Sequence, residues 1–145
     1  MMDGQMMDGQ MGAFGRLLGF EIIEWRNDLA ILDLRIRPEM LNRSGILHGG
    51  VLTTLIDTAG GYAGTFCAVE GHVRKALTLS LTTQFTGQTR DGVIRATARR
   101  RGGGRNTFFV DVSVTSEAGN EIAYGSGVWR YRRGHGDPNG VPAGD

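Results

Sequence analysis

The stretch that decides the fold of this chain is residues 42–67, NRSGILHGGVLTTLIDTAGGYAGTFC. From Gly49 onward, its apolar residues recur at intervals of three and four, which is the spacing of one face of an α-helix. The spacing predicts an amphipathic helix of about five turns, from Gly49 to Cys67. The residues before Gly49 predict a loop that leads into this helix, and Asp57 falls on the more polar part of the helix surface.

The junction between this loop and the helix combines an amide side chain, a glycine pair and a carboxylate: Asn42, Gly49–Gly50 and Asp57. The first N–H groups of a helix have no partner within it, and they lie at the positive end of the helix dipole. Such groups can stabilise an oxyanion, while a nearby carboxylate can act as a general base or nucleophile. The stretch therefore favours acyl transfer chemistry.

Three glycines inside the helical pattern, Gly60, Gly61 and Gly64, are unusual. Each glycine in a helix interior costs about 1 kcal/mol relative to alanine. We therefore expect close packing of this helix, either against a sheet curled around it or against a second subunit.

The remaining folded part of the chain has the pattern of strands. Residues 29–37 alternate apolar with charged side chains, which is the period of a half-buried strand, and Pro38 ends it because proline cannot continue the ladder. Further strands are predicted at residues 20–26, 76–85, 93–101, 106–116 and 121–131, with a short helix at 13–18. Two strands, one long helix and four more strands predict an α+β fold with one antiparallel sheet and one helix lying across it.

The length of 145 residues fits one domain with its own hydrophobic core. The first ten residues repeat a short unit without a basic start or an apolar run, and the last ones are rich in glycine and proline. We expect disordered tails at residues 1–11 and 134–145 and a folded domain at residues 12–133.

Composition excludes several function classes. The net charge of +1 argues against a general nucleic-acid partner, and no window has the apolar length of a membrane span. The single Cys67 forbids an internal disulfide and fits a reducing compartment. The scattered His48, His72 and His135 make no zinc spacing, so we expect no metal and no other cofactor. With one cysteine and no secretory signal, we expect a cytoplasmic protein.

Two catalytic motifs are also missing. There is no Gly-x-Ser-x-Gly elbow, which excludes an α/β-hydrolase mechanism. The run Gly102–Gly104 lacks the lysine and hydroxyl residue of a phosphate-binding loop and the helix that follows such a loop. We expect this run to form a hairpin loop or a bulge.

Asn42, then His48-Gly49-Gly50, then Asp57 resemble the hotdog-fold acyl-CoA thioesterases of the thioesterase superfamily, and in particular the phenylacetyl-CoA thioesterase type. The six-residue step from Asn42 to His48 and the nine-residue step from His48 to Asp57 agree with that branch. The resemblance covers roughly residues 15–132, because the order of elements and the strand lengths match too. It implies an antiparallel sheet of about six strands wrapped around one long central helix.

The resemblance also implies roles for individual residues. Asp57 would be the catalytic carboxylate, which either activates water or attacks the thioester carbonyl directly. The Gly49 N–H would bind the carbonyl oxygen, and the Asn42 amide would polarise or orient the thioester. His48 would support the loop more than it transfers protons, and Thr78 would lie near the attacking water.

The resemblance further implies an acyl-CoA substrate and sites built between two subunits, in a dimer or a dimer of dimers. Gly50 is expected beside the substrate. Arginine binds phosphates through its planar, permanently charged fork. Because Arg99, Arg100, Arg101 and Arg105 flank one predicted hairpin, we expect Arg100 and Arg101 to bind the phosphates of CoA together.

Two alternatives remain open. A hotdog dehydratase acting on 3-hydroxyacyl thioesters needs a histidine and a carboxylate together, and its motif has a bulky residue and a proline after the histidine, where His48 is followed by two glycines. A non-catalytic acyl-CoA-binding module would not need Asp57 and Asn42. The acyl group, and the choice between CoA and acyl carrier protein, are left open by the sequence.

Overall fold

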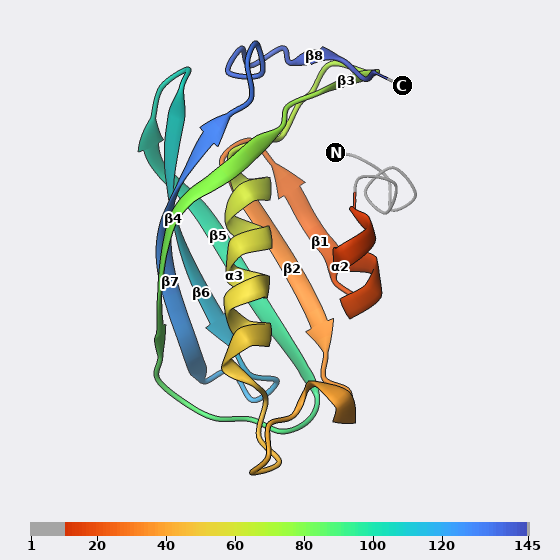
Figure 1. Cartoon of the computed structure of the whole chain (residues 1–145), viewed down its shortest axis with the longest axis vertical. Helices are drawn as coiled ribbons and strands as arrows, with labels where there is room; N and C mark the ends of the chain where they lie inside the picture. Colours follow the sequence, from red (N-terminus) through yellow and green to blue (C-terminus); the bar gives the residue numbers. More distant parts are fainter. Residues whose placement is uncertain (1–10, 145) are drawn as a thin grey trace.

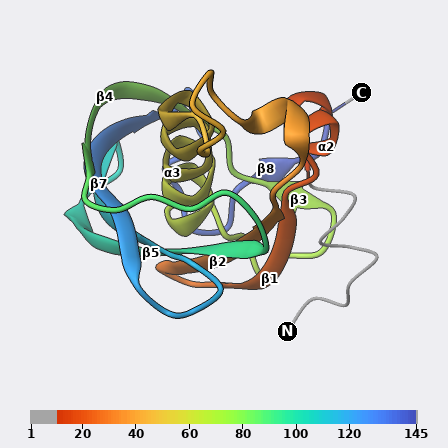
Figure 2. The same ribbon diagram turned by 90° about the horizontal axis from the view of Figure 1, so that it is seen from below.

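The centre of the fold is a single long helix, α3 (Gly49–Ala63), enclosed by one curved sheet. This computed structural model describes residues 11–144. The six strands are antiparallel and stand in the order β1-β2-β5-β6-β7-β4 (Figure 1). Their bounds are β1 (Glu21–Arg26), β2 (Leu29–Arg35), β4 (Ala76–Phe85), β5 (Val93–Gly103), β6 (Thr107–Thr115) and β7 (Glu121–Tyr131). Seen along the helix, the sheet wraps around it (Figure 2), so the predicted hotdog arrangement is confirmed.

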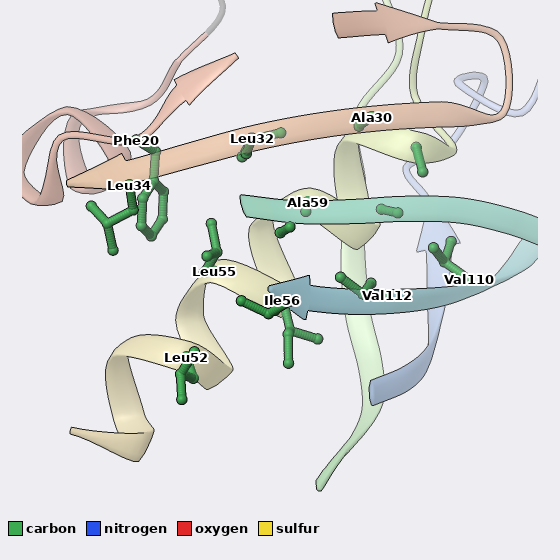
Figure 3. Close-up of a cluster of buried hydrophobic side chains, with 14 of the residues drawn as sticks. Phe20, Ala30, Leu32, Leu34, Leu52, Leu55, Ile56, Ala59, Val110 and Val112 are labelled. Atoms are coloured by element: carbon green, nitrogen blue, oxygen red, sulfur yellow. The ribbon is translucent and has the colours of Figure 1, made fainter. Parts of the chain in front are cut away.

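The core lies between the buried face of α3 and the concave face of the sheet. Leu52, Leu55, Ile56 and Ala59 of the helix belong to one buried cluster with side chains of the facing strands (Figure 3). The strand residues labelled with them are Ala30, Leu32, Leu34, Val110 and Val112, all of them buried. The alternation that predicts β2 therefore separates core residues from the outer face, as expected for a half-buried strand.

The remaining predicted elements are found with small shifts. Helix α2 (Ala13–Leu18) has the predicted bounds, while β2 ends at Arg35 and the 3-10 turn η1 (Pro38–Met40) begins at the proline. Strand β5 continues through Gly103, with a bulge between Arg100 and Gly102. In the part of the chain that the structure describes, no helix has the length and hydrophobicity needed to cross a bilayer.

The prediction that α3 continues to Cys67 is wrong, because the helix ends at Ala63. The Gly64 and Thr65 N–H groups tighten the last turn by donating to the carbonyls of Gly61 and Tyr62, and the Tyr131 hydroxyl donates to the Gly64 carbonyl at 2.6 Å. Beyond the helix, Phe66 packs edge-on against the Trp25 ring. Phe66 therefore continues the apolar spacing of α3 because it packs against the core, although it lies outside the helix.

The close packing expected from the helix glycines is found at Gly60. A Cβ atom there would overlap the ring of the buried Trp129 of β7, so alanine does not fit without movement. At the neighbouring Gly61, a Cβ atom would lie 3.6 Å from Trp129 Nε1, which is an ordinary contact distance. The sheet of the same chain therefore accounts for Gly60.

The prediction of a disordered C-terminal tail from residue 134 is wrong as far as residue 144. Strand β8 (Val141–Pro142) pairs with β3 (His72–Val73) in a small second sheet. The Nε and Nη2 groups of Arg74 donate to the carbonyls of His135 and Gly136, each at 3.1 Å. Hydrogen bonds to its backbone groups hold this segment, and such bonds leave no apolar pattern in the sequence.

The predicted N-terminal tail, residues 1–11, lies outside the described residues except for Met11. Met11 is buried, and the Tyr62 hydroxyl donates to its Sδ at 3.7 Å. Met11 therefore belongs to the folded domain, which corrects the predicted boundary by one residue.

Candidate active site

The predicted carboxylate and the predicted hydroxyl meet between α3 and β4. Thr78 Oγ1 donates to Asp57 Oδ1 at 2.6 Å. Both residues line a hollow of about 350 Å³, which we call the Asp57 hollow. Its other lining residues are Thr58, Gly61, Tyr62, Thr65, Arg74, Lys75, Ala76, Trp129 and Arg132. Thr78 thus fixes one oxygen of the carboxylate, and within residues 11–144 the other oxygen accepts no hydrogen bond.

Tyr62 lines the same hollow. Burial raises the pKa of its phenol above the ordinary value of 10.0, so the hydroxyl remains protonated at neutral pH. The lining of the Asp57 hollow therefore includes a carboxylate, the hydroxyls of Thr58, Thr65 and Thr78, and a neutral phenol.

Asn42 organises the loop before α3. Its Oδ1 accepts from the N–H of Ser44 at 2.9 Å and from the N–H of Ile46 at 3.1 Å. Asparagine commonly folds turns in this way. The side-chain oxygen is therefore used by the loop, and the Nδ2 group, which donates to no other described residue, is the part that can polarise a substrate carbonyl.

His48 caps the helix. Its Nδ1 accepts from the Gly50 N–H at 2.8 Å, which assigns the proton of the neutral imidazole to Nε2. The cap joins the loop to the first turn of α3, and the supporting role of His48 in catalysis stays a prediction. Gly50 is expected beside the substrate, but its N–H donates to His48 in this cap. Gly50 lines neither the Asp57 hollow nor the hollow around Asn42.

The N–H of Gly49, the first residue of α3, takes no part in the His48 cap. Gly50 and Val51 both donate to His48, whereas the Gly49 N–H has no acceptor in the described chain. Gly49 and Asn42 line a second hollow of about 570 Å³, which we call the Gly49 hollow. The Phe85 ring lies against Gly49, where a Cβ atom would come within 3.2 Å of it. Two N–H donors and the positive end of the helix dipole therefore meet here.

The Asp57 and Gly49 hollows are separate within one chain. They share no lining residue. Asp57 lies eight residues beyond Gly49, which places it about 12 Å further along the helix axis. One chain therefore presents the carboxylate and the N–H donors at two different places.

The expectation that Arg100 and Arg101 bind one anion together is wrong. Arg101 lies in the bulge and forms an ion pair with Asp111 at 3.4 Å on the outer face of the sheet. Arg100 lies over the Phe108 ring of the core and 3.7 Å from Asp28. The two guanidinium groups therefore lie apart, one beside Asp111 on the outer face and the other over Phe108 of the core.

The cations beside the Asp57 hollow are Arg74, Lys75 and Arg132, which the sequence reasoning did not single out. The positions of Lys75 and Arg132 at the ends of two strands could have predicted that they are neighbours. Lys75 directly precedes β4, Arg132 directly follows β7, and these strands pair antiparallel from Ala76 opposite Tyr131. Once this pairing is known, the two cations must be neighbours.

Comparison with known proteins agrees with the fold. Residues 44–123 match the family model described as the thioesterase superfamily. The chain is 32% identical over 114 residues to the acyl-coenzyme A thioesterase PaaI of Escherichia coli, across 77% of this chain and 76% of that protein. The solved structure of the E. coli PaaI protein has a TM-score of 0.76 and 26% identity, covering 89% of this chain and 91% of that one.

A thioesterase from Haemophilus influenzae has the same fold, with a TM-score of 0.79 and 21% identity over 91% of this chain and 92% of that one. Together with the family match, the sheet wrapped around α3 defines a hotdog-fold thioesterase. The chain belongs to the thioesterase superfamily and is a thioester hydrolase.

Proposed function

We propose that the protein hydrolyses acyl-CoA to a free acid and CoA at a site shared by two subunits. Asp57 of one subunit would face the Gly49 N–H and the Asn42 amide of the other. The observation that carries this proposal is the pair of hollows, one with a carboxylate fixed by Thr78 and one with two N–H donors. CoA is the proposed carrier because the E. coli relative is named as an acyl-coenzyme A thioesterase.

The chemistry needs one base or nucleophile and one oxyanion site, since a thioester carbonyl is already electrophilic. Water adds to the carbonyl carbon, the carbon–sulfur bond breaks, and the proton from water passes through Asp57 to the leaving thiolate. The free Oδ2 of Asp57 can take that proton, or it can attack the carbonyl itself. Thr78 positions the carboxylate for either route.

The edge of the sheet supports the shared site. Within residues 11–144, strand β4 pairs only with β7, and its ten residues leave a row of backbone groups open on the other side. Leu79 and Phe85 of this strand are 51% and 54% exposed. An open apolar edge of this length favours pairing with another strand.

Antiparallel pairing of two β4 strands would bring the separate hollows together. Thr78, near one end of β4, binds Asp57, whereas Phe85, at the other end, packs on Gly49. Two-fold symmetry opposes the Thr78 end of one strand to the Phe85 end of its copy. Asp57 would then approach the partner's Gly49, in a dimer or a dimer of dimers.

The direct test is a thiol-release assay with aryl, short-chain and medium-chain acyl-CoA. We expect release of CoA with at least one of these classes. Binding without release would favour the non-catalytic module, and hydration of enoyl-CoA would favour the dehydratase. The cap that occupies His48 Nδ1 argues against the dehydratase, which needs a histidine free for proton transfer.

Asn42→Asp is expected to lower kcat by about 10²–10³, the usual cost of losing one oxyanion donor. Aspartate keeps the oxygen that accepts from Ser44 and Ile46, so the loop and the melting temperature should stay near wild type. Asn42→Ala should lose activity and also about 1 kcal/mol of stability per lost hydrogen bond. Steady-state kinetics and thermal melts of both variants separate the two roles. An Asn42→Asp effect on KM alone would assign Asn42 to substrate binding.

A further inference from the structure

The Asp57 hollow contains three cations that the proposed reaction does not use. Arg74, Lys75 and Arg132, which we call the cationic rim, line it together with Thr65 near the C-terminal end of α3. The Arg132 N–H donates to the Lys75 carbonyl at 2.8 Å, which holds these two residues side by side. Lys75 and Arg132 are exposed, whereas Arg74 is only 9% exposed.

Arg74 is a buried charge without a carboxylate. Two of its N–H groups donate to the carbonyls of His135 and Gly136, and its guanidinium lies 4.5 Å from the centre of the Tyr131 ring. Among residues 11–144, neither Arg74 nor Lys75 nor Arg132 forms an ion pair, although six other pairs are present. A buried charge is costly without a compensating partner, and within residues 11–144 hydrogen bonds and a ring, not a carboxylate, accompany Arg74.

The pKa of His135 is affected by the charges of the rim. Burial, and then the charges of Lys75, Arg132 and Arg74, lower its pKa below the ordinary 6.5. His135 is therefore neutral at neutral pH, and its Nδ1 accepts from the Lys75 N–H at 2.8 Å. His135 therefore lies close enough to all three cations for their charges to lower its pKa.

We propose that the cationic rim binds the phosphate groups of the CoA nucleotide, an inference that rests on the proposed thioester hydrolysis. Asp57 and Thr65 line the same hollow, eight residues apart on and just beyond α3, or about 12 Å at the rise of a helix. The pantetheine arm of CoA is an extended chain of similar or greater length, so a sulfur near Asp57 leaves the phosphates near the rim. Arginine and lysine are the side chains that bind such groups.

The number of cations favours a nucleotide over a single phosphate. CoA carries a pyrophosphate and a 3′-phosphate, whereas a carrier-protein arm carries one phosphodiester. The arginines of the β5 hairpin do not offer an equivalent site, because Arg100 and Arg101 lie on opposite faces and each lies near an aspartate. The rim instead presents its cations beside the carboxylate of the proposed reaction.

The test is a Lys75→Ala/Arg132→Ala double variant, assayed with one acyl group on CoA, on phosphopantetheine and on pantetheine. The ratio of kcat/KM for acyl-CoA to that for acyl-pantetheine should fall about 10–100-fold, mainly through KM, because charge-assisted hydrogen bonds are lost. The ratio for acyl-phosphopantetheine should fall less. Arg133→Ala, an exposed neighbour outside the hollow, is the matched control and should leave both ratios unchanged.

A second readout does not depend on catalysis. Titration of wild type with free CoA, followed by the NMR signal of His135, should raise the pKa of His135 because bound phosphates offset the cations. The double variant should need at least tenfold more CoA for the same change. Unchanged ratios together with an unmoved His135 pKa would overturn the rim proposal while hydrolysis stands. Absence of hydrolysis with every thioester would overturn the proposed function, and the CoA titration would still decide the rim.

Discussion

Asp57→Asn is expected to lower kcat for thioester hydrolysis by about 10²–10⁴, the scale of a positioned general base or nucleophile. Asparagine has the shape of aspartate and still accepts the hydrogen bond from Thr78, but it can neither take a proton from water nor attack a carbonyl. KM for acyl-CoA and the melting temperature should change little. Single-turnover kinetics with the acyl-CoA that the wild type hydrolyses best measure the chemical step directly.

The control for this prediction is Asp111→Asn, the same chemical change on the outer face of the sheet. Asp111 pairs with Arg101 and lines no part of the Asp57 hollow, so its loss should leave kcat near wild type. If Asp57→Asn keeps more than about a third of the wild-type kcat, Asp57 is not the base or nucleophile. Equal losses in the two variants would point to a general effect of charge.

Gly60→Ala is expected to lower the free energy of unfolding by about 2 kcal/mol, because its methyl group would overlap the buried Trp129 ring. Gly61→Ala is the matched control, since a Cβ atom there fits at 3.6 Å from Trp129. Alanine favours the helix by up to about 1 kcal/mol over glycine, so this control should melt at or above the wild-type temperature. Thermal melts should therefore separate the two variants by roughly 10 °C.

The order of the two variants is the informative result. If Gly61→Ala is the more damaging change, the Gly61 side of α3 packs closely against a second subunit. If both variants melt like wild type, close contact between α3 and Trp129 is not the reason for glycine at position 60.

Local patterns were sufficient to predict most of the fold. The alternation of residues 76–85 and 121–131 predicts the bounds of β4 and β7 to the residue. In β7 this alternation follows from one buried face, whereas β4 is mostly exposed in one chain. The end of α3 was missed because Phe66 is half-buried against Trp25 without being helical. The segment after residue 133 was missed because backbone hydrogen bonds, which depend on position rather than side-chain type, hold it in place.

The candidate site was predictable only where its residues are close in sequence. The helix cap at His48 and the turn at Asn42 follow from local spacing. The Asp57–Thr78 contact needed the resemblance to a known family, because the two residues come from different elements. Arg100 and Arg101 were grouped by sequence proximity, although their side chains lie near different aspartates. The cationic rim could not be predicted because it depends on the pairing of β4 with β7.

The central claim is that the carboxylate and the N–H donors of one site come from two subunits. Mixing the inactive Asp57→Asn and Asn42→Asp variants, after partial unfolding and reassembly, tests it directly. A mixed dimer would contain one site with both changes and one intact site. With random reassembly of equal amounts, roughly a quarter of all sites would be intact in a two-fold dimer. We predict recovery of hydrolysis to about that fraction of the wild-type kcat, whereas a mixture no more active than its two components would contradict the shared site.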